Sequence, residues 1–163
     1  MSEHGAFHTT AITVAHAQVL AALHGEAFAE GWSAEAFASS LSQPGAFGVI
    51  AVSDDDGEPL GFALLRAALF ADQEDGEAEV LTIATRPGAR RRGVARRVMV
   101  EALTRARELG VARVFLEVAE NNAAAHALYE SLGFGEVARR KAYYAEAAGT
   151  RADAVVMALE LGV

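Results

Sequence analysis

The stretch IATRPGARRRGVARRVMVEAL, residues 83–103, sets the interpretation of this chain. It begins at the end of a predicted strand, Glu77–Thr85, and passes through a Pro-Gly step into an arginine-rich loop. From Val94 to Leu109 the apolar residues recur at helical spacing, and a glycine follows as a natural stop. The segment therefore predicts a strand, a loop and a long helix in direct succession.

The loop has the composition of an anion-binding site. In Arg90-Arg91-Arg92-Gly93-Val94-Ala95, successive backbone N–H groups join the unpaired N–H groups of the first helical turn. Gly93 allows close approach of the backbone to a phosphate, and the small Ala95 keeps the helix start open. The loop lacks the Gly-Lys-Ser/Thr ending of a P-loop and the three-glycine spacing of a dinucleotide fold. A compact anion such as a nucleotide phosphate is expected here, and a merely solvated helix face is the alternative.

Charge is unevenly spread along the chain. The net charge is −8, but residues 1–85 carry 13 acidic and one basic side chain, a net of −12, and residues 86–113 carry nine arginines and two acids, a net of +7. The remainder, residues 114–163, has a net charge of −3. Nucleic-acid binding ordinarily needs a broad basic footprint on a basic domain, so no nucleic-acid partner is expected.

The composition is that of a soluble globular protein. A length of 163 residues suits one domain, 1–163, and 52% of the residues are apolar. The chain has no cysteine, which excludes disulfides and thiolate chemistry, and its histidines lack metal-ligand spacing, so no metal is expected. No apolar run approaches the roughly 20 residues that span a membrane. A cytoplasmic protein without a membrane partner is expected.

Periodicity and turn residues predict a mixed α/β domain with the order strand–helix–helix–strand–strand–strand–helix–strand–helix–strand–strand. The expected strands are Phe7–Val14, Phe47–Val52, Leu60–Phe70, Glu77–Thr85, Arg113–Val118, Phe134–Tyr144 and Ala154–Leu161. The expected helices are Ala15–Phe28, one capped by Ser33, one starting at Val94, and one capped by Asn121 or Asn122 that ends near Leu132. Antiparallel arms would surround one βαβ unit.

The spacing Arg/Gln-x-x-Gly-x-Gly/Ala after a strand, followed by a long helix, a strand and an Asn-capped helix, resembles the GNAT acyltransferases from about Thr10 to Leu161. The resemblance implies the GNAT (acyl-CoA N-acyltransferase) fold, with a mixed, mostly antiparallel sheet and helices on both faces. It also implies acetyl-CoA as cosubstrate, with its pyrophosphate on the loop. The residues that fall where the family binds this cosubstrate are Ile83, Ala84, Thr85, Arg91, Arg92, Gly93, Val94, Ala95, Arg96 and Asn122.

A narrower resemblance is to the RimI type of this family, whose members acetylate the N-terminal amine of a ribosomal protein. The segments that carry it are Phe28–Ser33, Leu116–Val118, Asn121–Ala124, Ala127–Phe134 and Arg140–Tyr144. The Asn-x-x-Ala-x-x-Leu-Tyr-x-x-x-Gly-Phe pattern within them is shared by very many GNAT enzymes. The Trp-Ser step and the paired tyrosines are what favour the RimI type.

Acetyl transfer to an amine needs a base, an N–H donor for the developing oxyanion and a proton donor for the leaving thiolate. The resemblance places the base at Glu117 and the acid at Tyr129. Glu79 is the rival base; period-two spacing puts it on the face of Ile83, roughly 13 Å away along the strand. The backbone N–H of Ile83 or Ala84 is the expected oxyanion donor, and a bulge there would separate this strand from the next.

Trp32, Tyr143 and Tyr144 are candidates for the wall of the peptide site. Successive strand residues point to opposite faces, so at most one of the two tyrosines faces the site. A core position for Trp32 stays open, and no role is assigned to His24 or His126.

The sequence thus predicts an acetyl-CoA-dependent N-acetyltransferase that modifies a protein N-terminal α-amine, preferably alanine, by direct attack in a ternary complex. The acid-rich half of the chain could attract a basic substrate such as a ribosomal protein tail. The alternatives are a GNAT enzyme for lysine side chains or small amines, a non-catalytic acyl-CoA sensor, and a nucleic-acid binder that uses the arginine cluster.

Overall fold

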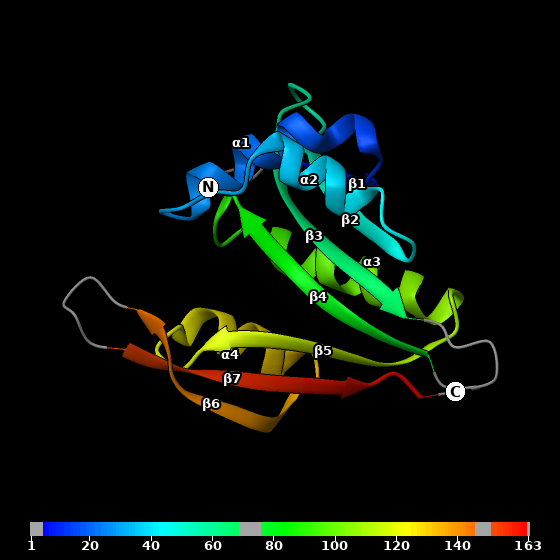
Figure 1. Ribbon diagram of the computed structural model, residues 1–163. Helices are drawn as coiled ribbons and strands as arrows, with labels where there is room; N and C mark the ends of the chain where they lie inside the picture. The colour runs from blue at the N-terminus through cyan, green and yellow to red at the C-terminus, as the bar shows by residue number, and fades with distance from the viewer. Residues whose placement is uncertain (1–4, 69–75, 146–150, 163) are drawn as a thin grey trace.

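The computed structural model describes residues 5–68, 76–145 and 151–162, which form one seven-stranded sheet with four α-helices (Figure 1). The strands are β1 (Phe7–Ala11), β2 (Ala46–Ser53), β3 (Pro59–Ala68), β4 (Gly76–Thr85), β5 (Val111–Ala119), β6 (Gly135–Ala145) and β7 (Arg151–Glu160). The helices are α1 (Ala17–Ala27), α2 (Ala34–Leu41), α3 (Val94–Glu108) and α4 (Ala123–Ser131), with short 3-10 turns at Val14–His16 and Pro87–Ala89. The predicted order of elements is confirmed.

The strand order in the sheet is β1-β2-β3-β4-β5-β7-β6, and only the β4–β5 pair is parallel. Helices α1 and α2 lie on one face of the sheet, and α3 and α4 lie on the other (Figure 1). β4 and β5 can pair in parallel because α3 carries the chain back along the sheet between them. A mixed, mostly antiparallel sheet with helices on both faces was predicted, and this is confirmed.

Two apolar clusters hold the helices against the two faces of the sheet. The larger cluster packs α3 residues such as Val98 and Met99 against the sheet, and the smaller one packs Leu20 and Leu23 of α1 and Phe37 of α2 against the other face. These five side chains are at most 1% exposed. The helical spacing of apolar residues therefore records which side of each helix meets the sheet.

The helix caps predicted at Ser33 and at Asn121 or Asn122 are present in the structure. The Ser33 hydroxyl accepts a hydrogen bond from the Ala36 N–H at 3.1 Å, and Asn122 Oδ1 accepts one from the Ala125 N–H at 3.2 Å. The first strand is shorter than predicted and ends at Ala11. The reason is local: the Thr13 N–H donates to His16 Nδ1 at 2.9 Å, which starts a 3-10 turn where the strand was expected to continue.

Candidate active site

Strands β4 and β5 separate part-way along their length. In the described part of the chain, β4 pairs with β5 only over Gly76–Glu79, opposite Val111–Phe115, whereas β4 itself continues to Thr85. Beyond Glu79, β4 is paired with β3 on one edge, and β5 is paired with β7 (Figure 1). One edge of β4 is thus left without a strand partner, and an extended ligand can line such an edge as an additional strand does.

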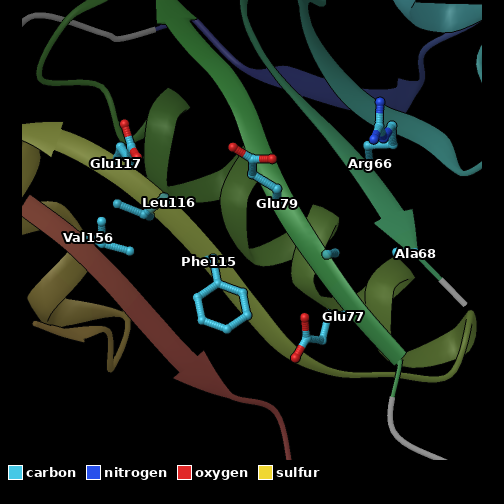
Figure 2. A pocket seen from close by; sticks show the side chains of 9 residues that line it. Arg66, Ala68, Glu77, Glu79, Phe115, Leu116, Glu117 and Val156 are labelled. Carbon is cyan, nitrogen blue, oxygen red and sulfur yellow. The ribbon is translucent and has the colours of Figure 1, made fainter. Parts of the chain in front are cut away.

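A hollow of about 370 Å³ lies where the two strands part. Figure 2 shows the side chains around it, with helix α3 behind the strands. Its lining residues are Arg66, Ala68, Glu77, Ala78, Glu79, Phe115, Leu116, Glu117 and Val156. Three carboxylates and the Arg66 guanidinium line the hollow, and Arg140 adds a second positive charge where it pairs with Glu117. The net charge around the hollow is therefore −1, which favours a cationic ligand such as a protonated amine. Glu77 and Glu79 both lie in β4, as the predicted strand Glu77–Thr85 requires.

Glu117, the predicted base, lies in this hollow and is held by Arg140 of β6. The Arg140 Nη2 donates to both carboxylate oxygens of Glu117, at 2.6 Å and 2.7 Å. The side chains are 31% and 50% exposed, so the pair meets solvent. A carboxylate has about four acceptor positions, so lone pairs remain for a proton or a water molecule. Arg140 was not predicted as a site residue, because nothing in the sequence links it to a residue 23 positions earlier.

Strand β4 contains the bulge that the sequence left open. Leu64 of β3 pairs with Thr82, and the next residue, Leu65, pairs with Val80. Leu81 is therefore an extra residue on β4. A bulge bends the strand that carries it and increases its twist, which is how β4 turns away from β5.

The bulge also corrects one prediction. Val80 packs in the cluster beneath α3, so its neighbour Glu79 points to the opposite face and into the hollow. Beyond the bulge, Ile83 packs beneath α3 and Ala84 beneath α1. Glu79 and Ile83 therefore lie on opposite faces, and the prediction that they share one was wrong. One inserted residue shifts the period-two pattern of everything that follows.

Tyr129, the predicted acid, lies on the other side of the sheet from the hollow. It belongs to α4, is 5% exposed, and packs edge-on against Phe134 with ring centroids 5.9 Å apart. It belongs to the same cluster as α3, whereas Glu117 faces the hollow. The two predicted catalytic side chains thus flank the parting of β4 and β5 from opposite faces, as needed if the amine and the thioester approach from opposite sides.

The loop before α3 has the backbone of an anion cradle. Arg91 and Gly93 both adopt the left-handed conformation, with φ of 64° and 78°. For Arg91 this conformation costs roughly 1–2 kcal/mol, which is the kind of strain that concentrates at functional sites. A left-handed residue followed by a right-handed one, as at Gly93 and Val94, turns consecutive N–H groups toward one point. The first turn of α3 adds donors that have no partner within the helix.

The arginine side chains of this region divide into two groups. Arg92 donates to the Gly5 carbonyl at 2.7 Å, and Arg96 donates to the Ser131 hydroxyl at 2.7 Å, so both side chains tie the loop to other segments. The side chains of Arg90 and Arg91 are exposed and form no hydrogen bond or ion pair with any described residue. The side-chain charge offered to an anion therefore centres on Arg90, which was not predicted individually, and on Arg91, which was.

Trp32 does not line the hollow. It is 39% exposed and stacks on His24 of α1, with ring centroids 4.9 Å apart. Tyr143 and Tyr144 lie in β6, but their side chains are outside the described part. His24, to which no role was assigned, is 3% exposed and contacts both Trp32 and the bulge of β4. The sequence feature that could have identified His24 is its position on the apolar face of a predicted helix.

The described residues contain no group of three or more His, Cys, Asp or Glu side chains that could hold a metal ion. None of their helices is long and apolar enough to cross a membrane.

The sequence matches the Acetyltransferase (GNAT) family over residues 17–134. The chain belongs to this family. It is 38% identical over 108 residues to the [ribosomal protein bS18]-alanine N-acetyltransferase of Escherichia coli (strain K12), covering 66% of this chain and 68% of that protein. It is 38% identical over 136 residues to the N-alpha-acetyltransferase RimI of Mycobacterium tuberculosis, covering 82% of each.

Solved structures agree. The crystal structure of the ribosomal-protein-S18-alanine N-acetyltransferase from Escherichia coli matches this chain with a TM-score of 0.83 and 30% identity, covering 97% of this chain and 96% of that one. The GNAT fold, the resemblance to the RimI type and the N-acetyltransferase activity are thereby confirmed. In this enzyme the parting of β4 and β5, with its acidic hollow on one side and the anion cradle on the other, is the candidate site of acetyl transfer.

Proposed function

We propose that this GNAT enzyme transfers the acetyl group of acetyl-CoA to the N-terminal α-amine of a protein, with alanine as the first residue. The observation that carries the proposal is the 38% identity to enzymes named for acetylating an N-terminal alanine of a ribosomal protein or an α-amine. The acidic hollow supports it, because the ammonium form of an α-amine is attracted there. We take residues 1–163 as one catalytic domain, since the seven strands form one sheet.

The loop before α3 fits the pyrophosphate of acetyl-CoA. Its residues Arg91 and Gly93 have left-handed backbone, and a Cβ added at Gly93 would meet no atom of the described residues within 4 Å apart from its chain neighbours, so the space beside it is open. We assign the diphosphate to the backbone of residues 91–96, with charge from Arg90 and Arg91. The unpaired edge of β4, at Ile83, Ala84 and Thr85, would bind the pantetheine arm, together with the Asn122 amide.

Glu117 is the proposed general base. An α-amine has a pKa near 8 and is mostly protonated at neutral pH, so it must lose a proton before it attacks. Glu117 lies in the hollow where the amine would enter, and Arg140 holds its carboxylate in place. The proton passes from the ammonium to a free lone pair of this carboxylate, directly or through one water molecule.

Two further groups complete the proposed chemistry. Successive N–H groups of a strand point to opposite edges, so either Ile83 or Ala84, not both, offers its N–H to the acetyl oxygen at the unpaired edge. Tyr129, on the α4 side, would give its phenolic proton to the leaving thiolate. The amine attacks directly, and no acetylated residue is formed on the protein.

The test is mass spectrometry on one peptide incubated with the enzyme and acetyl-CoA. The peptide carries a free N-terminal alanine, basic residues after it and one internal lysine. The matched control is the same peptide with its N-terminus already acetylated. We expect one acetyl group on the α-amine of the first peptide and none on the control. Acetylation of the lysine in both would refute the α-amine assignment, and labelling only of small amines would refute a peptide substrate.

A further inference from the structure

His24 occupies an unusual position for a titratable side chain. It is 3% exposed and packs within a group of aromatic rings: Phe28 and Trp32 stack on it at 4.3 Å and 4.9 Å between centroids, and Phe37 meets it edge-on at 5.5 Å. Both ring nitrogens are nonetheless engaged. Nδ1 lies 3.0 Å from the Trp32 backbone nitrogen, and Nε2 lies 3.1 Å from the Thr82 hydroxyl.

These contacts define the protonation of the ring. A backbone N–H can only donate, so Nδ1 must accept from Trp32 and carries no proton. The proton of the neutral ring is then on Nε2 and is donated to the Thr82 hydroxyl. A protonated ring would set two N–H groups against each other at Trp32. Burial lowers the pKa of His24 from its ordinary value of 6.5, which favours the neutral ring that this arrangement needs.

The two partners of His24 belong to different parts of the candidate site. Thr82 is in the bulge of β4, and the peptide unit that follows it carries the Ile83 N–H, a proposed oxyanion donor. Trp32 belongs to the segment between α1 and α2, which lies beside the end of β4 where β4 and β5 have separated (Figure 1). Only His24 among the described residues links these two segments through side-chain hydrogen bonds.

The α1–α2 segment is closely fitted to α1 around this histidine. A Cβ added at Gly31 would lie 2.8 Å from the Gly25 Cα and 3.0 Å from its nitrogen. The chain therefore folds back on α1 at a distance that only glycine allows, and it places the Trp32 N–H within 3.0 Å of His24 Nδ1. Loss of the ring nitrogen would leave this part-buried N–H without its acceptor, and the segment would then move so that water can take the acceptor's place.

We propose that His24 is a positioning residue for acetyl transfer, which fastens the α1–α2 segment to the bulge of β4 through its two ring nitrogens. The bond to Thr82 holds the peptide unit that carries the Ile83 N–H, and the bond to Trp32 holds the α1–α2 segment beside the separated end of β4. This inference rests on the proposed function for the identity of the amine substrate, but not for the oxyanion donor that acts on the acetyl group. The two bonds should act on different kinetic parameters.

Two substitutions separate the bonds. Asn places a polar atom near the position of Nδ1, so His24→Asn keeps an acceptor for Trp32 and loses the donor to Thr82. Gln reaches the position of Nε2, so His24→Gln keeps the donor and loses the acceptor. We expect His24→Asn to lower kcat about tenfold with a nearly unchanged KM for the amine, because a misplaced donor is felt at the transition state. We expect His24→Gln to raise the amine KM about fivefold and lower kcat less than twofold.

Thr82 gives the matched pair of variants. Thr82→Val removes the hydroxyl at nearly constant shape and should lower kcat as His24→Asn does, and Thr82→Ser should restore it. The double variant His24→Asn with Thr82→Val should be no slower than either single variant, because both remove one bond. Thermal unfolding of each variant identifies any that fails to fold.

The ring itself can be observed in the unmodified enzyme. Long-range ¹H–¹⁵N NMR spectra at neutral pH should show His24 neutral with its proton on Nε2. A proton on Nδ1, wild-type kcat in Thr82→Val, or a parallel fall of kcat and rise of KM in both His24 variants would each overturn the proposal. Kinetics are run with whichever amine the wild-type enzyme acetylates. If that amine is not a peptide α-amine, the proposed function fails and the His24 proposal is still tested.

Discussion

Replacement of Glu117 by Gln separates its chemical role from its structural one. Gln has the same shape and still offers one oxygen to Arg140 Nη2, which now bonds both carboxylate oxygens at 2.6 Å and 2.7 Å. The pair is solvent-exposed, at 31% and 50%, so its loss should change the free energy of unfolding by less than about 1 kcal/mol. Loss of a general base should lower kcat about 10²-fold, or about 2.7 kcal/mol of activation free energy.

The assay is steady-state acetylation of the alanine peptide, with acetyl-CoA binding measured separately. We expect the affinity for acetyl-CoA to change less than twofold, because the anion cradle lies on the other side of the sheet. The matched control is Glu79→Gln, which removes a neighbouring carboxylate from the same hollow and should lower kcat less than about threefold. Normal turnover in Glu117→Gln together with a large loss in Glu79→Gln would refute the assignment and make Glu79 the base.

Three further outcomes follow from the same geometry. Tyr129→Phe should lower kcat about 10²-fold in steady-state assays with acetyl-CoA binding kept, since only the phenolic proton is lost; wild-type turnover would exclude Tyr129 as the acid. Gly93→Ala should lower the free energy of unfolding in urea by about 1–2 kcal/mol, because φ at this residue is 78°. It should also raise the KM for acetyl-CoA more than it lowers kcat. An unchanged KM for acetyl-CoA would place the diphosphate elsewhere. Burial lowers the pKa of His24 below 6.5, so the unfolded chain binds more protons than the folded one and the free energy of unfolding should fall as the pH drops below about 6.5. Urea midpoints measured across this pH range should fall less in His24→Gln than in the unmodified enzyme. An equal fall in both proteins would assign the pH dependence to other groups.

Several features of this fold could be predicted because they rest on local chemistry. Ser33 and Asn122 cap helices because their side-chain oxygens reach N–H groups three residues ahead. The long helix could be predicted from apolar spacing, since Val98, Met99 and Ala102 must meet the sheet on one side. The anion-binding loop could be predicted because it consists of Gly93 and the start of a helix, which are adjacent in the sequence.

The candidate catalytic residues could be placed only in part. Glu117 was expected near the substrate, and it lines the hollow. Its partner Arg140 was missed, because a contact between β5 and β6 depends on the intervening β7 hairpin. The side chains of Arg92 and Arg96 were expected at the cosubstrate, yet they bond to the Gly5 carbonyl and to Ser131. Sequence shows that arginines cluster, but not which of them are used internally.

What the sequence by itself determined is the set of elements, their order and the family to which they belong, since periodicity, caps and loop motifs act over a few residues. What only the tertiary structure decided is the site's geometry. Leu81 is inserted against β3, which turns Glu79 and Ile83 to opposite faces and parts β4 from β5. His24 meets Thr82 across 58 positions of sequence. Such register shifts and distant pairings depend on how whole layers pack together, and local sequence carries no record of that packing.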